Sequence, residues 1–414
     1  MTSTTECRPW SPSTEDGGRP DRSRRIADLW VRGFRSVVDA RLAPGQMCAL
    51  VGEAQVGKSN LLAAVHAILD ENAHLVPTDA TTLAETTIRI EATLATGERL
   101  ALEGAEPGVS RTGDPPPVLH LPASERAANL VASEPDDPLA ERALGLFREA
   151  LDEQGRGMPP VSGTLPATSL VDGLEACCLL GIRGLVLLVE EPKLYLRPQA
   201  QRYLYRLLRT FARGGNQVLY TTHSPNLLNV ARLDELVLVR LTEHGTRTVQ
   251  PEMLSPGEDF RLLTEFDAQR SELFLARAAL LVEGQTERLA LPFAFAACGY
   301  DVDRESVSIV ECGGKANIVV FARVCRAADI PFVVLHDRDR GDDVLNEAIR
   351  GLAGDHRTIV LGPDFEHLAG LRSGTHKPER AWRRFSSIGR DELPPALRRA
   401  VELAVELARA GGTR

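Results

Sequence analysis

Short apolar runs of strand length, separated by segments with helical spacing of apolar side chains, make up most of the chain after about residue 25. In the first part of the chain, a turn at Thr96-Gly97 joins two runs that alternate apolar and polar residues, as in a hairpin. This part is therefore expected to mix α and β structure. Strands are predicted over 26–34, 47–52, 86–94 and 98–104, and a helix over 61–69.

Residues 104–168 interrupt this regularity with clusters of Pro and Gly, and only about 137–153 has a convincing helical pattern. We expect this stretch to be irregular, as an insertion or a shortened arm. The regular pattern then returns and closes a first domain near residue 270. Strands are predicted over 185–190, 217–222, 235–241 and 246–250, and a helix over 199–212.

A second alternation of short apolar strands and helices follows the first domain. This pattern predicts a small parallel sheet with helices on both faces, in an α/β domain over about 271–370. In such a sheet, ligands bind at the carboxyl ends of the strands. Strands are predicted over 278–283, 307–311, 331–336 and 357–361, with helices ending near 298 and spanning 315–328 and 342–352.

The length and composition describe a globular chain with two or three cores: 414 residues, of which 43% are hydrophobic and 25% charged. Residues 1–24 lack apolar periodicity and are expected to be a disordered tail. No apolar run approaches the roughly 18 residues needed to span a bilayer, and no secretory signal is visible. We therefore expect a cytoplasmic protein that makes no membrane contact.

The cysteines and the charge exclude further classes. Seven cysteines without a C-x-x-C pair do not predict a disulfide framework or a zinc knuckle, so we expect reduced thiols. The net charge of −9 excludes a polycation that coats nucleic acid, so any DNA contact must be local. Only four of the 48 basic residues are lysine, and three of those four, Lys58, Lys315 and Lys377, fall near the phosphate sites proposed below.

The segment from Gly52 to Ser59, GEAQVGKS, fits the phosphate-loop pattern G-x-x-x-x-G-K-[ST] and lies between a predicted strand and a predicted helix. In this loop, backbone amides beside Gly52 and Gly57 hold the phosphates, Lys58 reaches the β and γ oxygens, and Ser59 ligates Mg²⁺. The alternative is an ordinary Gly-rich turn. The pattern predicts an ATP site.

Two later strands end in groups that suit the same nucleotide. Glu190 and Glu191 end the strand LVLLVE, where Glu190 can hold Mg²⁺ and Glu191 can orient the attacking water. The next strand leads to His223, which is placed to touch a γ-phosphate. Paired surface glutamates and a structural histidine are the ordinary alternatives, but the order of the three features along the chain favours a nucleotide site.

These three segments, GEAQVGKSN, VEEPKLYLRPQ and TTHSPNLL, resemble the ATPase head of the ABC class, as in repair proteins of the SMC and RecF type. Two departures stand out. The stretch SGTLPATSLVDGLEA lacks the L-S-G-G-Q-like signature that reaches across a head dimer, and the interval from Ser59 to Glu190 is short. ATP binding is therefore a safer expectation than ATP turnover.

The second domain gathers carboxylates after its strands. Glu283 and Glu287 follow the first strand, and Asp337 and Asp339 follow the third, two positions apart, so that both can project to one side. Carboxylates that share one sheet edge repel each other, and hard cations such as Mg²⁺ or Mn²⁺ relieve that repulsion. The alternative is a solvated acidic rim.

The combination of VEG-x-T-E, GGKAN and D-x-D resembles a Toprim domain. An ABC-type head followed by Toprim resembles the OLD (overcoming lysogenisation defect) family of ATP-dependent endonucleases over about 25–380. The resemblance implies a P-loop ATPase domain over 25–270, a Rossmann-like Toprim domain over 271–370, and a metal site of four carboxylates. It also adds Glu366 as a further acidic participant and Lys377 as the residue that faces the scissile phosphate. The four carboxylates are Glu283, Glu287, Asp337 and Asp339.

The activity that the resemblance implies is metal-dependent hydrolysis of DNA phosphodiesters, with Glu283 as a ligand or a proton shuttle. It also implies a homodimer or higher homo-oligomer, because such heads pair across ATP, and a role in phage defence with an accessory protein. Two alternatives stay open: a DNA-binding or scaffold protein that does not cleave, and a topoisomerase-like transferase, which would need a tyrosine nucleophile.

DNA is expected to contact the helical C-terminal segment, 371–414. Residues 372–399 contain eight basic and three acidic residues, a local charge of +5, and Arg380, Arg383 and Arg384 are the expected backbone contacts. Lys315, after Gly313-Gly314, is a further candidate for a DNA phosphate. A solvated helix face and a helix-opening turn are the respective alternatives.

Overall fold

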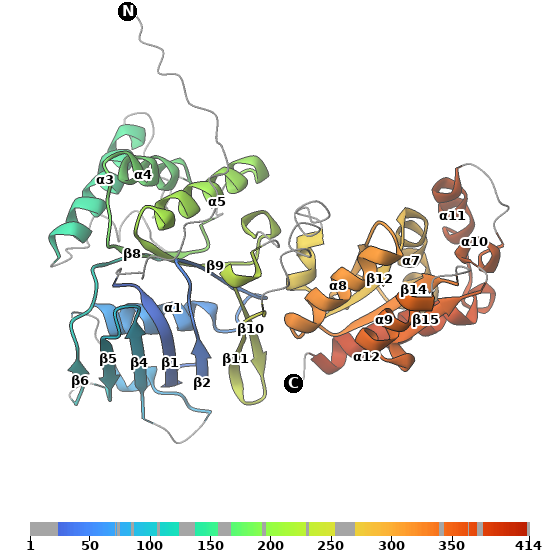
Figure 1. Ribbon diagram of the computed structural model, residues 1–414, viewed down its shortest axis with the longest axis horizontal. Helices are drawn as coiled ribbons and strands as arrows, with labels where there is room; N and C mark the ends of the chain where they lie inside the picture. The colour runs from blue at the N-terminus through green and yellow to red at the C-terminus, as the bar shows by residue number, and fades with distance from the viewer. Residues whose placement is uncertain are drawn as a thin grey trace, which may run out of the picture.

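The computed structural model places two α/β bodies side by side, one formed by residues up to 252 and the other by residues from 270 onward (Figure 1). No helix among the described residues is both long and apolar enough to cross a membrane. The structure describes residues 24–411 except for 71, 73–74, 84–86, 106–107, 124–136, 156–166, 193–195, 229–231, 253–269, 339–342, 363 and 371–375. The predicted tail before residue 24 and Asp339 therefore lie outside the described residues.

A six-stranded sheet forms the centre of the first body. Its order is β11-β10-β3-β9-β8-β7, and all neighbours are parallel except the β10–β11 hairpin. The central strands β3 and β9 are buried on both faces, which explains the continuous apolar sequence of β3. The strands are β3 (Met47–Val51), β7 (Val118–Leu121), β8 (Val186–Glu190), β9 (Gln217–Thr222), β10 (Leu236–Thr242) and β11 (Gly245–Val249).

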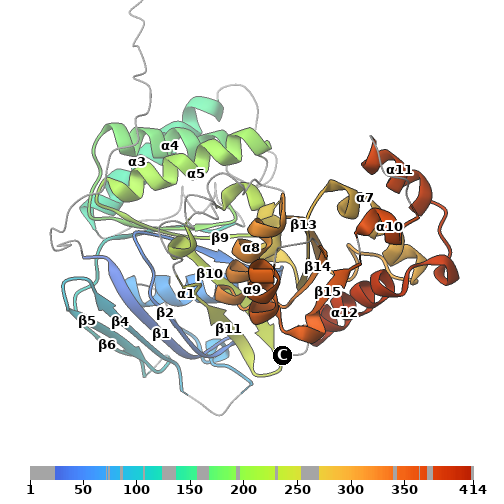
Figure 2. The ribbon, with the colours of Figure 1, turned by 45° about the vertical axis from the view of Figure 1, so that its right-hand side comes forward.

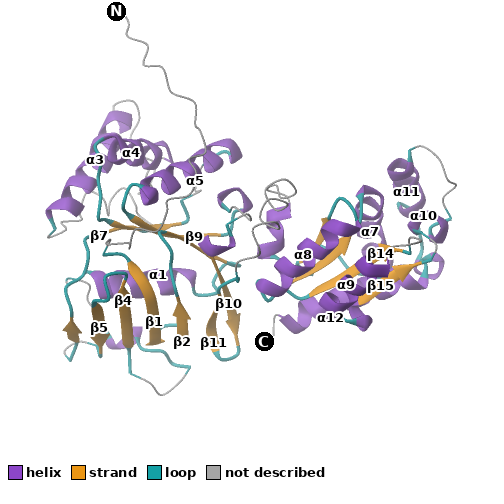
Figure 3. Ribbon diagram, viewed as in Figure 1, coloured by secondary structure: helices purple, strands orange, loops and turns teal. Residues whose placement is uncertain are grey.

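An antiparallel sheet of five strands lies on one side of this centre, in the order β2-β1-β4-β5-β6. Helix α1 (Lys58–Leu69) packs between the two sheets, and its apolar side chains share one core with both (Figure 3). The strands are β1 (Ile26–Phe34), β2 (Val37–Leu42), β4 (Arg89–Leu94), β5 (Arg99–Glu103) and β6 (Ser110–Thr112).

Three helices cover the opposite face of the six-stranded sheet: α3 (Pro138–Gly155), α4 (Ala167–Leu179) and α5 (Pro198–Arg213) (Figure 2). Phe147 and Phe211 are among the largest side chains buried beneath them. The first body is thus layered as antiparallel sheet, α1, mixed sheet and helices. This arrangement brings the carboxyl ends of β3, β8 and β9 to a common edge.

The second body is a four-stranded parallel sheet in the order β13-β12-β14-β15. Helices α7 and α12 share a core with one face, and α8 and α9 pack on the other. The expected C-terminal segment is helical, and α12 packs directly on this sheet. The elements are β12 (Ala278–Val282), β13 (Val307–Glu311), β14 (Phe332–Asp337), β15 (Thr358–Leu361), α7 (Gln285–Ala297), α8 (Lys315–Ala327), α9 (Asp343–Ala353), α10 (Phe365–Leu368), α11 (Lys377–Phe385) and α12 (Pro395–Gly411).

The stretch expected to be irregular, 104–168, contains two strands that the sequence pattern did not predict, β6 and β7. Strand β7 has only four residues and follows three prolines, so its alternation is too short to be recognised, but pairing with β8 fixes it in the sheet. The six cysteines in the described part of the chain are free, and all except Cys178 are buried.

Candidate nucleotide and metal sites

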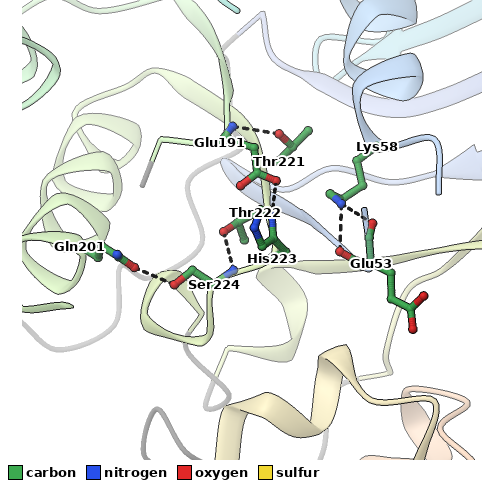
Figure 4. A network of polar contacts seen from close by, with 9 residues as sticks. Glu53, Lys58, Glu191, Gln201, Thr221, Thr222, His223 and Ser224 are labelled. Carbon is green, nitrogen blue, oxygen red and sulfur yellow. Dashed lines mark hydrogen bonds and ion pairs between the residues drawn. The ribbon is translucent and has the colours of Figure 1, made fainter. Parts of the chain in front are cut away.

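The loop between β3 and α1 has the geometry of a phosphate cradle. Strand β3 ends at Val51, and α1 begins at Lys58, directly after Gly57. The Lys58 side chain is buried, and its Nζ donates to the carbonyl oxygens of Gly52, at 2.9 Å, and Glu53 (Figure 4). Ser59 is exposed in the first helical turn. The loop therefore presents a charged amine and the amides of a helix N-terminus to one anion.

Both loop glycines are required by close packing against the β10–β11 hairpin. A Cβ on Gly57 would lie 2.1 Å from Thr246 Oγ1, and a Cβ on Gly52 would lie 2.2 Å from the Val239 carbonyl oxygen. Gly57 also has a φ of +101°, which a side chain disfavours. The hairpin thus fixes the shape of the phosphate loop from behind.

Glu190 and Glu191 end the neighbouring parallel strand β8, as expected. Glu190 Oε2 accepts a hydrogen bond from the Ala123 amide at 3.1 Å. The Glu191 amide donates to Thr221 Oγ1 at 3.0 Å, and the Glu191 carboxylate lies 2.8 Å from His223 Nδ1 (Figure 4). The structure therefore brings Glu191 and His223 together beside the phosphate loop, where a carboxylate paired with an imidazole can orient a water molecule.

A contact between the two bodies reaches the phosphate loop itself. Arg277 Nε and Nη2 donate to the two Glu53 carboxylate oxygens at 2.8 and 2.9 Å. This pairing lowers the pKa of Glu53 and raises that of Arg277. Arg277 directly precedes β12, so the head touches the edge of the second sheet at which its strands begin. Arg240 binds the Ala328 and Asp329 carbonyl oxygens near the same edge.

The opposite edge of the second sheet carries the carboxylates. Glu283 follows β12 and Asp337 ends β14, and these strands are neighbours. The Asp337 amide donates to Glu283 Oε1 at 2.8 Å, and the Phe365 amide donates to Asp337 Oδ1 at 2.8 Å. Glu287, in the first turn of α7, is buried. Backbone amides therefore fix two of the predicted carboxylates in one place.

The carboxylates of this edge repel one another. Burial, together with the charges of Asp337, Glu283 and Glu366, raises the pKa of Glu287 to about 7. Burial and the charges of Glu283 and Glu366 also raise the pKa of Asp337 to about 7. This all-oxygen donor set suits a hard divalent cation, which would relieve the repulsion. Within the described ranges, which omit Asp339, no three acidic, His or Cys side chains are already arranged around one metal position.

The two lysines of this region hold different positions. Lys377 Nζ pairs with Glu366 Oε1 at 2.8 Å, which raises the pKa of Lys377. Lys315 is 6% exposed, and its Nζ donates to the Asp337 carbonyl oxygen at 2.8 Å. Lys315 therefore lies beneath the carboxylates and supports the end of β14, rather than standing on the surface. Sequence spacing alone did not reveal this supporting contact.

The C-terminal arginines predicted to contact DNA lie on α11, and two of them have acidic partners. Arg383 pairs with Glu379 at 2.6 Å, and Arg384 pairs with Glu392 at 3.1 Å. Two nitrogens of the half-buried Arg380 lack a hydrogen-bond partner within the described part of the chain. The local charge of the segment is therefore partly neutralised by its own carboxylates.

Family models match both bodies. A model described as Overcoming lysogenization defect protein-like, TOPRIM domain, matches residues 274–339. A model described as an AAA domain (AbiEii toxin, Type IV TA system) matches residues 167–229. The first match includes Glu283, Glu287 and Asp337, and the second includes Glu190, Glu191 and His223.

Parts of the chain are similar to named proteins. The OLD nuclease of Thermus scotoductus is 34% identical over 285 residues, which cover 59% of this chain and 54% of that protein. The Old nuclease of Escherichia phage P2 is 27% identical over 167 residues, which cover 39% of this chain and 28% of that protein. A weak structural similarity to the SMC head domain from Thermotoga maritima, with 16% identity and a TM-score of 0.38, covers 55% of this chain and 100% of that one.

The chain spans about half the length of the Thermus relative, and less of the phage protein. The two domain models nevertheless fall on the two bodies in the order that the motifs predict, with the phosphate loop in the first and the carboxylates in the second. The fold prediction, a P-loop ATPase head followed by a Toprim domain, is confirmed. The chain thus pairs an ATPase domain with an OLD-like Toprim domain, and it is similar to OLD nucleases over more than half of its length.

Proposed function

We propose that this chain is an ATP-binding DNA endonuclease that depends on Mg²⁺ or Mn²⁺ and hydrolyses phosphodiester bonds in its Toprim domain. The main support for this proposal is the hydrogen bond from the Asp337 amide to the Glu283 carboxylate, which holds both residues at one edge of a parallel sheet. Buried Glu287 lies beside them. The names of the OLD nuclease relatives agree with this chemistry. Asp339, outside the described residues, is proposed to complete the set.

The residues divide the chemistry among them. Glu283, Glu287, Asp337 and Glu366 would hold the cations, which when bound lower the pKa of the attacking water and neutralise the leaving oxygen. Lys377, already near this cluster through Glu366, would place a positive charge beside the scissile phosphate. Buried Lys315 would hold the end of β14 in position.

The head is proposed to bind ATP with Mg²⁺. Lys58 and the loop amides would hold the phosphates, Ser59 and Glu190 would hold Mg²⁺, and Glu191 with His223 would orient water. Because the sequence lacks the signature segment, turnover is expected to be slow. The resemblance to ABC-type heads supports a homodimer or higher homo-oligomer, and the resemblance to the OLD family supports phage defence with an accessory protein. The proposed location is the cytoplasm.

A cleavage assay tests the nuclease proposal directly. The purified protein is incubated with plasmid and linear DNA in Mg²⁺, in Mn²⁺ and in excess chelator. Cleavage with either metal and none with chelator is the expected result. DNA binding without cleavage under any metal condition would instead identify a DNA-binding or scaffold protein.

The C-terminal arginines are proposed as a DNA contact next to the carboxylate edge. Changing Arg380, Arg383 and Arg384 together to Ala is expected to weaken binding to unrelated sequences about equally. Each lost phosphate contact reduces the salt slope by about 0.9, so the slope should flatten by up to about 3. A salt titration of DNA affinity measures this, and an unchanged slope would remove the segment from the DNA site.

A further inference from the structure

Helix α5 carries a row of arginines on one side. Its sixteen residues, Pro198–Arg213, contain four arginines and no aspartate or glutamate, in a chain whose net charge is −9. At about 100° per residue, the four arginines fall within an arc of roughly 60° and extend over roughly 16 Å of the helix axis. We call this row the α5 arginine face; it consists of Arg202, Arg206, Arg209 and Arg213.

The α5 arginine face points away from the protein. The opposite side of the helix buries Leu204, Leu208 and Phe211 against the six-stranded sheet. Arg202, Arg206 and Arg213 are exposed, and Figures 1 and 2 show α5 on the outer side of the head beside α4. Tyr203 is 41% exposed, and the Arg206 guanidinium lies 5.8 Å from the centre of its ring. The face therefore combines cations with an accessible aromatic ring.

A small pocket lies at the C-terminal end of this face. It has a volume of about 170 Å³, and its lining includes Arg209, Arg213 and Arg232 together with Asp234 and Glu235. The buried Glu235 carboxylate is already engaged by Tyr205 Oη at 2.7 Å and Arg209 Nε at 3.2 Å. No hydrogen bond or ion pair of the Arg213 guanidinium occurs among the described residues.

Three guanidinium groups and two carboxylates line this pocket, so positive charge is in excess. Partial desolvation and the charges of Arg209 and Arg232 lower the pKa of Arg213. An anion placed between these guanidinium groups would relieve the repulsion and complete their hydrogen bonding. A guanidinium offers two parallel donors that match two oxygens of one phosphate group. The chemistry of the pocket is therefore suited to a phosphate.

We propose that the α5 arginine face binds the phosphate backbone of duplex DNA, with one phosphate in the pocket beside Arg213 and Arg232. The inference rests on the proposed nuclease function, which makes DNA the polyanion that this protein meets. A straight row of roughly 16 Å is long enough to meet several phosphates of a duplex, in which each strand carries one phosphate per about 3.4 Å of axis. Contacts of this kind fix position on the duplex without reading its sequence.

Another arginine-bearing surface gives a matched control. Arg32, Arg89 and Arg99 are exposed on the five-stranded sheet. Arg32 lies opposite Asp39 in the β1–β2 register, and Arg89 lies opposite Glu103 in the β4–β5 register. Changing these three arginines to Ala lowers the net charge by three, as the α5 variant does, but leaves the α5 arginine face unchanged.

The test compares two triple variants of the full chain, each with three arginines changed to Ala. The first changes Arg202, Arg206 and Arg213, and leaves Arg209 to pair with Glu235; the second is the sheet control. Binding of two unrelated fluorescent duplexes is measured by anisotropy in excess chelator, so that no cleavage occurs, between about 50 and 200 mM salt. Thermal unfolding and circular dichroism establish that each variant folds.

The α5 variant is expected to bind both duplexes about ten-fold or more weakly at the lower salt concentration, and its salt slope should flatten by up to about 2.7. The control should keep a slope close to the parental value. An α5 variant with the parental affinity and slope, or a control that loses as much, would overturn the inference. If the unaltered protein cuts DNA in the metal assay, the nuclease proposal stands whatever the α5 variant does. If the unaltered protein neither binds nor cuts DNA, both the nuclease proposal and the α5 inference are wrong.

Discussion

Asp337→Asn and Glu283→Gln are each expected to lower metal-dependent DNA cleavage at least about a thousand-fold, because each removes one negative ligand from the proposed cation site. The amides are chosen to preserve local structure. Asn at 337 can still accept from the Phe365 amide, and Gln at 283 can still accept from the Asp337 amide. The rate is measured on plasmid DNA with saturating Mn²⁺.

The control for this experiment is Glu347→Gln, which neutralises an exposed carboxylate on α9 in the same domain. It should cleave at the parental rate. Asp337→Ala and Glu283→Ala should also be inactive yet folded, since loss of a repelling carboxylate does not unpack the core. If the two amide variants cut DNA at the parental rate, the carboxylate edge is not the catalytic site.

Lys58→Ala is expected to weaken ATP binding at least about a hundred-fold, because only backbone dipoles then face the β and γ phosphates. Lys58 Nζ now lies against the Gly52 and Glu53 carbonyl oxygens, within the cradle, so its loss removes the charge that the loop positions. Titration with a fluorescent ATP analogue measures the affinity.

The same variant should still cleave bare DNA within about two-fold of the parental rate, because the proposed metal site lies in the other body. Loss of cleavage together with ATP binding would show that the head controls the Toprim domain obligatorily. The unaltered protein is expected to hydrolyse ATP slowly. A rate typical of heads with a complete signature segment would show that the missing segment does not limit ATP hydrolysis.

The fold could be predicted from the sequence because its strands are short, apolar and regularly separated. Strand β12 is fully buried, and the phosphate loop has a fixed spacing that requires Gly52 and Gly57. Local pattern therefore located the ends of β3, β8 and β12, where most predicted site residues lie. Strand β7 escaped prediction because its order comes from pairing with β8, which lies more than sixty residues later.

The side-chain partners were less predictable, because they depend on distant parts of the chain. Arg277 and Glu53 are 224 positions apart, and no periodicity connects them. Lys315 was predicted to contact a DNA phosphate, but it is buried under Asp337. The C-terminal segment was predicted to be basic from its charge count, which does not show that Arg383 and Arg384 have acidic partners. Composition records charges but not the distances between them.

Strand β12 joins two very different surroundings. Arg277, directly before it, touches the phosphate loop, and Glu283, directly after it, belongs to the carboxylate edge. Six residue steps of an extended strand separate the two by about 20 Å. A nucleotide at the phosphate loop and a scissile phosphate at the carboxylate edge would therefore lie near opposite ends of β12 and would not compete for space. One chain could hold both ligands at once, each loaded and released by its own route.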